Sequence, residues 1–240
     1  DAQESRGLGD VYKRQDLRRM VDWTAATGQR VLQILPIHDT TLTGENTDSY
    51  PYNAISVYAF HPMYVDLRAL PALPDARQQA AFDREFRELN ALPTIDYARV
   101  NKLKRDFLLL SFRAHGRELL KSQAYATFAT RHAQWLPAYA AFSALRDKFA
   151  SPDFHRWPQH AEYDAEAVAA TFAPGTAERE TYDFYCYVQY LLHTQLSEVT
   201  AHARRSGVVL KGDIPIGIAR CSVEAWTEPH YFNLNGSARA

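Results

Sequence analysis

The chain has 240 residues, of which 46% are hydrophobic, and a formal net charge of −1 at pH 7. This length can bury a sizeable core, and the near-neutral charge excludes an electrostatic attraction to nucleic acid or to an anionic membrane. No apolar run approaches the roughly 20 residues of a membrane span, and the first residues lack a signal-peptide pattern. Cys186 and Cys221 have no disulfide or metal spacing, so the expected location is the reducing cytoplasm.

Residues 16–37 predict a helix followed by a strand. Asp16 is expected to cap the helix and Gly28 to close it. The apolar face of the helix is expected to comprise Leu17, Met20, Val21 and Trp23. The following run, Val31 to Ile37, is almost uniformly apolar, which is typical of a strand buried on both faces of a parallel sheet. This order indicates an α/β fold.

The loop after this strand is where we expect ligand-binding side chains, because ligands bind beyond the carboxyl ends of parallel strands. Pro51 fixes its own φ and holds Tyr50 extended, which sets the directions of the neighbouring aromatic rings. Aromatic faces beside short polar side chains suit a sugar, although a surface loop that caps a core can have the same composition. The candidate residues are Asp48, Ser49, Tyr50, Tyr52 and Asn53.

A second buried strand is predicted from Val208, with Asp213 at its carboxyl end. An unpaired buried carboxylate costs several kcal/mol, so Asp213 requires a partner. That partner could be an arginine, a backbone amide or a substrate hydroxyl. Because parallel strands end at the same edge of a sheet, we expect Tyr52 and Asp213 to lie at neighbouring strand ends, facing one sugar-sized hollow.

The rest of the chain is mainly helical in character. Residues 70–180 are rich in Ala and Arg, and they are followed by one long helix that Gly207 should end. A short helix capped by Ser222 should follow the second strand. Helices are predicted over residues 75–89, 97–120, 135–149, 178–205 and 222–226. Gln189 and His193 are assigned to packing, and Glu224 and Glu228 to the favourable field near a helix start.

Several motifs, in order, resemble the amylomaltase family of 4-α-glucanotransferases. They are Gln33-Ile34-Leu35-Pro36, then Asp48-Ser49-Tyr50-Pro51-Tyr52, then Ser56-Val57-Tyr58-Ala59, then Gly212-Asp213-Ile214-Pro215-Ile216, and Ser222-Val223-Glu224-Ala225-Trp226. The sequence of this loop is most similar to the longer, disproportionating-enzyme branch of the family, in which starch-binding modules precede the catalytic domain. The match covers about residues 16–235, and residues 1–15 are set apart as a suspected foreign segment, because an insertion follows their Gly-x-Gly-Asp turn.

The resemblance implies the amino-terminal part of a (β/α)8 barrel with a large α-helical insertion. Residues 16–69 would begin the barrel, 70–180 would form the insertion and 181–240 would continue the barrel. It implies that Tyr52 and Asp213 bind maltose, maltodextrin or another α-1,4-glucan, with Asp48 and Ser49 shaping the loop. His61 stands where the family has asparagine and is assigned a structural role. No cofactor is implied, and no metal site is predicted.

The family's catalytic motifs are missing from the sequence. A retaining enzyme needs two carboxylates about 5 Å apart, one as nucleophile and one as acid/base. The family carries them in R-x-D-H and E-D-L-G strands, and neither motif occurs here. A barrel takes about 250 residues before insertions. We therefore expect a fragment that lacks transferase activity by itself.

Two other functions are considered beside the transferase. A related α-glucan hydrolase could share the barrel, and a non-catalytic glucan-binding module could be built around the tyrosine loop. Binding modules of this size are usually antiparallel sandwiches with alternating sequence patterns, and this chain shows no such alternation.

Overall fold

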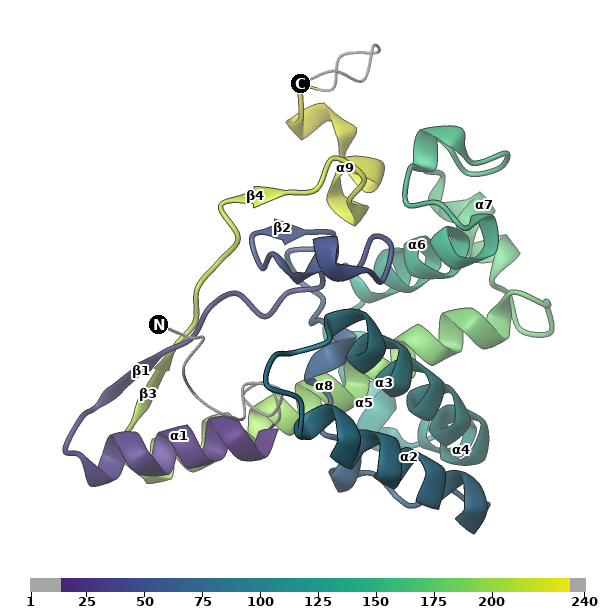
Figure 1. The fold of residues 1–240 in the computed structure, drawn as a ribbon. Coiled ribbons are helices and arrows are strands. Elements are labelled where there is room, and N and C mark those ends of the chain that lie inside the picture. The colour runs from purple at the N-terminus through teal and green to yellow at the C-terminus, as the bar shows by residue number, and fades with distance from the viewer. Residues whose placement is uncertain (1–13, 234–240) are drawn as a thin grey trace.

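The computed structural model describes residues 14–233, which form mainly helices with two short pairs of strands beside them (Figure 1). The predicted segment 1–15 lies outside these residues, apart from the first two residues of α1. In chain order the elements are α1 (Arg14–Ala26), β1 (Val31–Gln33), β2 (Asn53–Ala54), α2 (Ala76–Asn90), α3 (Tyr97–Ser111), α4 (Arg117–Leu119), α5 (Gln123–Arg131), α6 (Leu136–Phe149), α7 (Ala165–Thr171), α8 (Arg179–Arg205), β3 (Val209–Lys211), β4 (Gly217–Ile218) and α9 (Val223–Thr227).

Local capping explains most helix boundaries. The carboxylate of Asp75 accepts hydrogen bonds from the amides of Arg77 and Gln78 in α2, and the hydroxyl of Ser222 accepts one from the amide of Ala225 in α9. Gly28 and Gly207 adopt left-handed φ values of +77° and +67° just after α1 and α8. The predicted cap at Asp16 is wrong, because α1 begins earlier and places this acid in its first turn, where the helix dipole favours it.

Both strand pairs are parallel. β1 pairs with β3 with Leu32 opposite Leu210, and β2 pairs with β4 with Asn53 opposite Gly217. The predicted α/β class is confirmed, and so is the parallel arrangement of the two predicted strands, which correspond to β1 and β3. In the part of the chain that the structure describes, each sheet has two strands.

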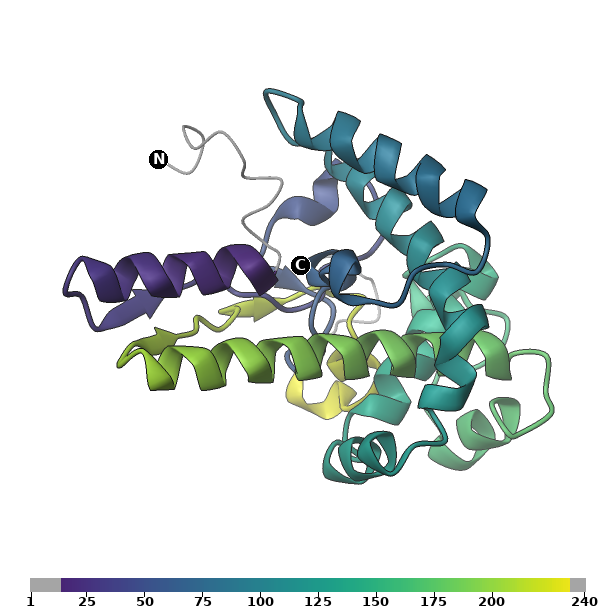
Figure 2. The same ribbon diagram turned by 90° about the horizontal axis from the view of Figure 1, so that it is seen from below.

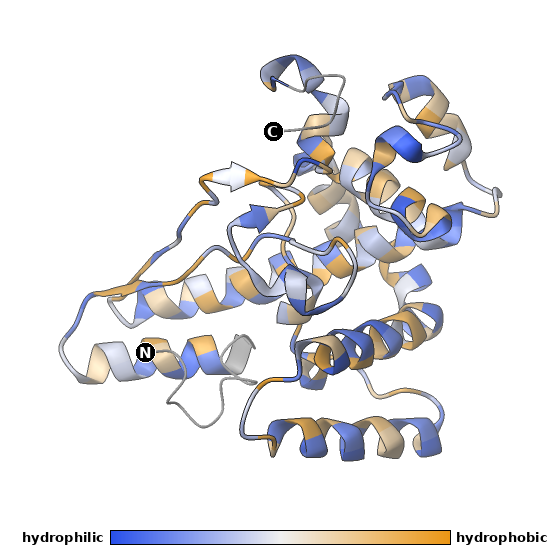
Figure 3. Ribbon diagram, turned by 45° about the horizontal axis from the view of Figure 1, so that its top comes forward, coloured by the Kyte–Doolittle hydropathy of each residue, from blue (hydrophilic) through white to orange (hydrophobic). Residues whose placement is uncertain are grey.

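The prediction that these strands are buried on both faces is wrong. Helices α1 and α8 lie side by side along β1 and β3 (Figure 2), and Leu32 and Leu210 pack against Val21 of α1 and Ala203 of α8. On the opposite face Val31 is 53% exposed. Its partner Val209 is 62% exposed. Apolar residues therefore run along both strands (Figure 3), but helices cover one face only.

The predicted apolar face of α1 also needs correction. Val21 is fully buried, whereas Met20 is 41% and Trp23 is 55% exposed. The reason is geometric, since α1 contacts α8 and β1 along a narrow stripe centred on Val21. The two larger side chains lie outside that stripe.

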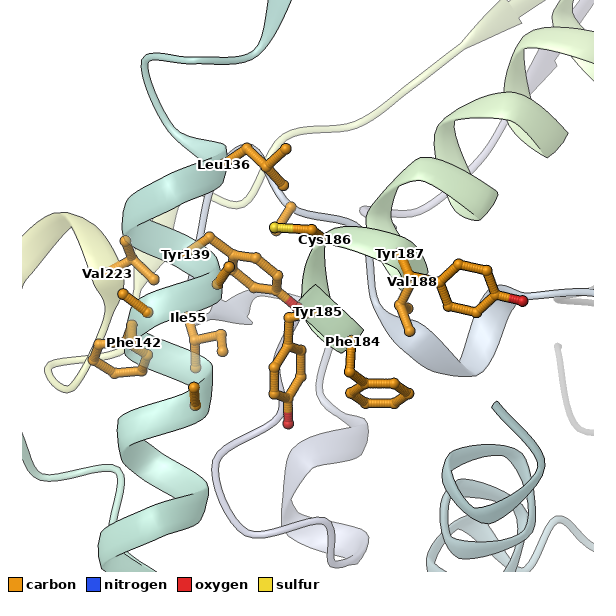
Figure 4. Close-up of a cluster of buried hydrophobic side chains, with 14 of the residues drawn as sticks. Ile55, Leu136, Tyr139, Phe142, Phe184, Tyr185, Cys186, Tyr187, Val188 and Val223 are labelled. Carbon is orange, nitrogen blue, oxygen red and sulfur yellow. The ribbon is translucent and has the colours of Figure 1, made fainter. Parts of the chain in front are cut away.

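The main core surrounds α6 and α8 (Figure 4): Tyr139 and Tyr185 meet between these helices, Phe142 packs towards α9, and Tyr187 points away from α6 towards α3. Members of this cluster come from all three predicted segments, 16–69, 70–180 and 181–240. The helix predicted over 97–120 is realised as α3, a π-helical stretch at 112–116 and α4. Two short helices, α5 and α7, were not predicted.

Amide side chains of α8 hold the irregular segment that follows β2. Gln189 is fully buried; its Oε1 accepts from the amide of Phe60 at 2.9 Å and its Nε2 donates to the carbonyl of the same residue at 2.8 Å. Gln195 makes the same pair of bonds with Asp66. His61 is 3% exposed, and its Nε2 lies 2.7 Å from the hydroxyl of Tyr97. The predicted packing and structural roles of Gln189 and His61 are thus confirmed.

Candidate functional site

Tyr52 and Asp213 meet in the structure. Tyr52 immediately precedes β2, and Asp213 follows β3 by two residues. The phenol of Tyr52 donates to Oδ2 of Asp213 at 2.9 Å, although 161 residues separate them in the sequence. The predicted meeting of these two side chains is therefore observed, although Tyr52 lies at the start of β2 and not at the carboxyl end of a strand.

The environment of the pair is polar and partly open. Besides Tyr52, Asp213 accepts a hydrogen bond at Oδ1 from the amide of Ile214 at 2.9 Å. The sequence suggested an arginine, a backbone amide or a substrate hydroxyl as the partner of Asp213. The structure shows a backbone amide and, in addition, the hydroxyl of Tyr52. The hydrogen bond to the carboxylate is the main reason that the pKa of Tyr52 is raised, because it stabilises the protonated phenol. The pair thus presents a phenol and a carboxylate side by side.

A second aromatic ring lies beside that of Tyr52. The ring centroids of Tyr50 and Tyr52 are 5.6 Å apart, and Tyr50 is 61% exposed. Exposed aromatic faces next to a hydrogen-bond acceptor can stack on the apolar face of a sugar ring while the acceptor binds its hydroxyls. Such an arrangement can bind and orient a polyhydroxyl ligand.

Asp48 and Ser49 occupy different environments within the same loop. Asp48 is 3% exposed, and its Oδ2 accepts from the amides of Leu42, Thr43 and Gly44 at 2.9, 2.8 and 2.6 Å. Its carboxylate therefore closes the loop on itself. Ser49 is exposed, and its hydroxyl donates to the carbonyl of Asn46 at 2.7 Å.

A cavity of about 370 Å³ lies next to Ser49, on the side of the loop that faces the end of β1. Its walls include Leu35, Pro51, Tyr64 and Ile95. The segment after β1, the loop that carries Tyr50 and Tyr52, and the turn before α3 therefore surround the same cavity. Ser49 is the predicted site residue that contributes to this wall.

A larger cavity of about 680 Å³ was missed by sequence reasoning. It lies between the loop at 41–45 and helices α3, α6 and α8, and Arg146 forms part of its wall. Arg146 is 5% exposed and donates to the carbonyl of Thr41 at 2.7 Å and to the hydroxyl of Tyr185 at 2.8 Å. An arginine within the otherwise apolar stretch of α6 is the signal that could have indicated it.

Asp147 balances the charge in this region. It is 2.8 Å from Arg105 and 3.2 Å from Arg146. Burial opposes its ionisation, but the two guanidinium groups outweigh that effect, so the pKa of Asp147 is lowered. These bonds tie the loop at 41–45 to α3, α6 and α8, which holds the segment that leads to Tyr52.

The parallel strand pairs and the contact between Tyr52 and Asp213 define the class: an α/β protein with a tyrosine–carboxylate pair beside its parallel strands. An antiparallel sandwich, the architecture expected of a small glucan-binding module, is contradicted by this pairing. Within residues 14–233, no helix combines the length and apolar character required to cross a membrane.

The chain belongs to the 4-alpha-glucanotransferase family, glycoside hydrolase family 77, whose family model matches residues 1–240. The predicted family is thereby confirmed. The matched range includes residues 1–15.

Curated relatives carry the same description. The chain is 35% identical over 242 residues to the 4-alpha-glucanotransferase DPE2 of Oryza sativa, covering 99% of this chain and 25% of that protein. It is 33% identical over 246 residues to the 4-alpha-glucanotransferase of Chlamydia trachomatis, covering 99% of this chain and 43% of that protein. The chain therefore spans less than half the length of these relatives.

Solved structures with a similar fold are amylomaltases. The amylomaltase of Streptococcus agalactiae in complex with acarbose has a TM-score of 0.72 at 24% identity, covering 93% of this chain and 43% of that one. The amylomaltase of Corynebacterium glutamicum has a TM-score of 0.68 at 22% identity, covering 93% and 30%. At these identities the likeness establishes the fold.

Proposed function

We propose that this chain forms the glucan-binding part of a 4-α-glucanotransferase, which transfers α-1,4-glucan segments between maltose or maltodextrins. The observation that carries the proposal is the contact between Tyr52 and Asp213, in a chain that belongs to the family. The solved amylomaltase complex contains acarbose, which supports a carbohydrate ligand for this fold.

The roles proposed for the two side chains follow from their chemistry. The ring of Tyr52 offers an apolar face and its phenol a hydrogen bond, while the carboxylate of Asp213 accepts hydrogen bonds from sugar hydroxyls. A bound sugar would replace the phenol as the donor to Asp213. Asp48 would act indirectly, by fixing the loop that carries Tyr52. Ser49 would contact ligand from the wall of the adjacent cavity.

The reaction itself requires residues beyond these. Retaining transfer takes place in two displacements, in which one carboxylate forms a glycosyl-enzyme and a second protonates the leaving oxygen. An acceptor hydroxyl then replaces water in the second step. R-x-D-H and E-D-L-G motifs are absent from this sequence, so we assign its residues to binding and orientation. The chemistry needs no metal or cofactor.

For the architecture, we propose the amino-terminal part of a (β/α)8 barrel. Residues 16–69 and 181–240 would supply parallel strands, and 70–180 would be an α-helical insertion. The parallel pairing of β1 with β3 and of β2 with β4 supports this arrangement. The exposed side chains of Val31 and Val209 are consistent with a face that the interior of a closed barrel would cover. We place the protein in the cytoplasm, since both cysteines are free thiols.

The test is an assay of maltotriose conversion. We expect the 240-residue chain to produce neither glucose nor longer maltodextrins, and the complete protein to produce both. In the complete protein, Tyr52→Ala should lower turnover by on the order of 10²-fold, because a mispositioned substrate reacts slowly. Tyr231→Ala is the matched control, since Tyr231 is 77% exposed. Near-normal turnover of the Tyr52 variant would contradict the assignment.

A hydrolase is the second candidate, since transfer and hydrolysis differ only in the acceptor of the glycosyl-enzyme. Measuring the gain in reducing ends beside the redistribution of chain lengths separates the two. Redistribution without net gain supports the transferase, and a matching gain of reducing ends supports the hydrolase.

A further inference from the structure

The two segments that carry Tyr52 and Asp213 are joined by a very short ladder. β2 and β4 are two residues long each, with Asn53 opposite Gly217 and Ala54 opposite Ile218. A register slip of one residue would turn every side chain of a strand to the opposite face. A ladder of this length fixes register weakly by itself, so further contacts must set the position of Tyr52 relative to Asp213.

These further contacts continue the pairing towards α9. The amide of Ala219 donates to the carbonyl of Ala54 at 2.7 Å, and the amide of Val223 donates to the carbonyl of Ile55 at 2.8 Å. The next connection is made by a side chain. Oε1 of Glu224 accepts from the hydroxyl of Ser56 at 2.9 Å and from the amide of Val57 at 3.0 Å.

This connection lies in a buried part of the molecule. Ser56 is 1% exposed, and the neighbours of Glu224 on α9, Val223 and Ala225, are 4% and 2% exposed. Burial is the main reason that the pKa of Glu224 is raised, and the hydrogen bonds at Oε1 act in the opposite direction. Oε2 of Glu224 is buried and has no hydrogen-bond partner among the described residues.

Burying a carboxyl group with one oxygen unpaired costs free energy of folding, so the inward position of Glu224 requires an explanation. A solvated glutamate beside the helix start would serve the helix dipole equally well, so the field of α9 does not explain why this side chain turns inward. What the inward position gains is two hydrogen bonds to the segment that begins with Tyr52.

We propose that Glu224 is a positioning residue, which fixes the register of β2 against β4 and thereby holds Tyr52 against Asp213. The proposal rests on the proposed function only for the role of Tyr52 and Asp213 in binding glucan. The claim that Glu224 positions these two side chains does not depend on that function. Glu224 acts through its hydrogen bonds to Ser56 and Val57 and does not need to touch Tyr52 or Asp213 itself.

The experiment measures the Tyr52–Asp213 contact directly. The 240-residue chain is labelled with ¹³C at Cζ of tyrosine, the Tyr52 signal is assigned with Tyr52→Phe, and its chemical shift is followed from neutral to alkaline pH. Because the hydrogen bond to Asp213 raises the pKa of Tyr52, loss of the contact lowers that pKa towards its ordinary value. Asp213→Asn defines the response when the charged acceptor is removed.

Three substitutions separate positioning from general stability. Glu224→Ala should lower the pKa of Tyr52 and shift its neutral-pH signal. Glu224→Gln keeps an oxygen that can accept from Ser56 and Val57, so it should restore the wild-type titration. Glu228→Ala is the matched control, because Glu228 is exposed and forms an ion pair with His230.

An unchanged Tyr52 titration in a folded Glu224→Ala variant would overturn the proposal, whatever the change in melting temperature. If that variant does not fold, Glu224→Asp carries the same expectation, since its shorter side chain does not reach Ser56. A Gln variant that behaves like the Ala variant would also count against positioning through Oε1. The maltotriose assay of Tyr52→Ala tests the proposed function independently, so the two failures are distinguishable.

Discussion

Replacing Gln189 by leucine should destabilise the chain strongly, although the two side chains have nearly the same volume. Gln189 is fully buried and pairs with both backbone groups of Phe60, at 2.9 and 2.8 Å. Leucine makes neither bond, and each backbone group left unpaired costs about 1–3 kcal/mol. Because Phe60 is only half-buried, we expect the lower part of that range, for a total of about 2–4 kcal/mol. Single-domain proteins are stable by about 5–15 kcal/mol, so this is a substantial fraction.

Urea unfolding followed by circular dichroism measures the effect, with the slope m compared to show that the unfolding reaction is the same. Gln78→Leu is the matched control, because Gln78 is exposed on α2, and its stability should stay within about 0.5 kcal/mol of wild type. A change below about 1 kcal/mol for Gln189→Leu would refute the reasoning that this amide satisfies the backbone of Phe60.

Three further predictions concern pH and backbone conformation. Burial lowers the pKa of His193 to about 4, below the ordinary 6.5, so the neutral form supports the fold and stability falls as pH drops below 6.5. His193→Phe should remove roughly 1–2 kcal/mol of the loss between pH 7 and pH 5, measured by urea unfolding at both pH values. The pKa of Asp147 is lowered, so its contribution is present above its unfolded pKa and is lost as pH falls through its folded pKa; Asp147→Asn should flatten the stability profile below about pH 4. Gly28→Ala should cost about 1–2 kcal/mol in urea unfolding, because φ is +77° there; Gly212→Ala, at a position without a positive φ, should cost less.

The sequence was sufficient where a pattern is local. The apolar run at Val31, the long stripe of α8 and the cap at Ser222 each express a short-range preference, and the corresponding elements are present. The meeting of Tyr52 with Asp213 could also be predicted, because two parallel strands end at the same edge.

Features that depend on distant partners could not be predicted in this way. Which side of α1 is buried depends on where α8 lies, so the sequence pattern included Trp23 in the apolar face and the structure exposes it. The inward position of Glu224 depends on donors 167 and 168 residues away, and a field at a helix start was the simpler interpretation of the sequence. The burial of Arg146 likewise depends on its hydrogen bond to the carbonyl of Thr41, 105 residues earlier.

Long-range polar contacts also explain how the segment that follows Tyr52 can be irregular and still fixed. Between residues 55 and 66 the chain has no regular strand, yet its backbone groups must find partners when buried. Side chains of distant helices supply them: Glu224 at Val57, Gln189 at Phe60, and Gln195 at Asp66.

Lys104 of α3 completes the set, since its ammonium is buried and donates to the carbonyl of Val65 at 2.9 Å and to that of Met63. Each of these bonds is made to the main chain, so the side chains of residues 57–66 do not specify the contact. The position of this segment is therefore set by α3, α8 and α9 together with backbone hydrogen bonds to Ile37 and Asp39. Substitutions in these helices should shift the tyrosine loop more than conservative changes within residues 57–66 themselves.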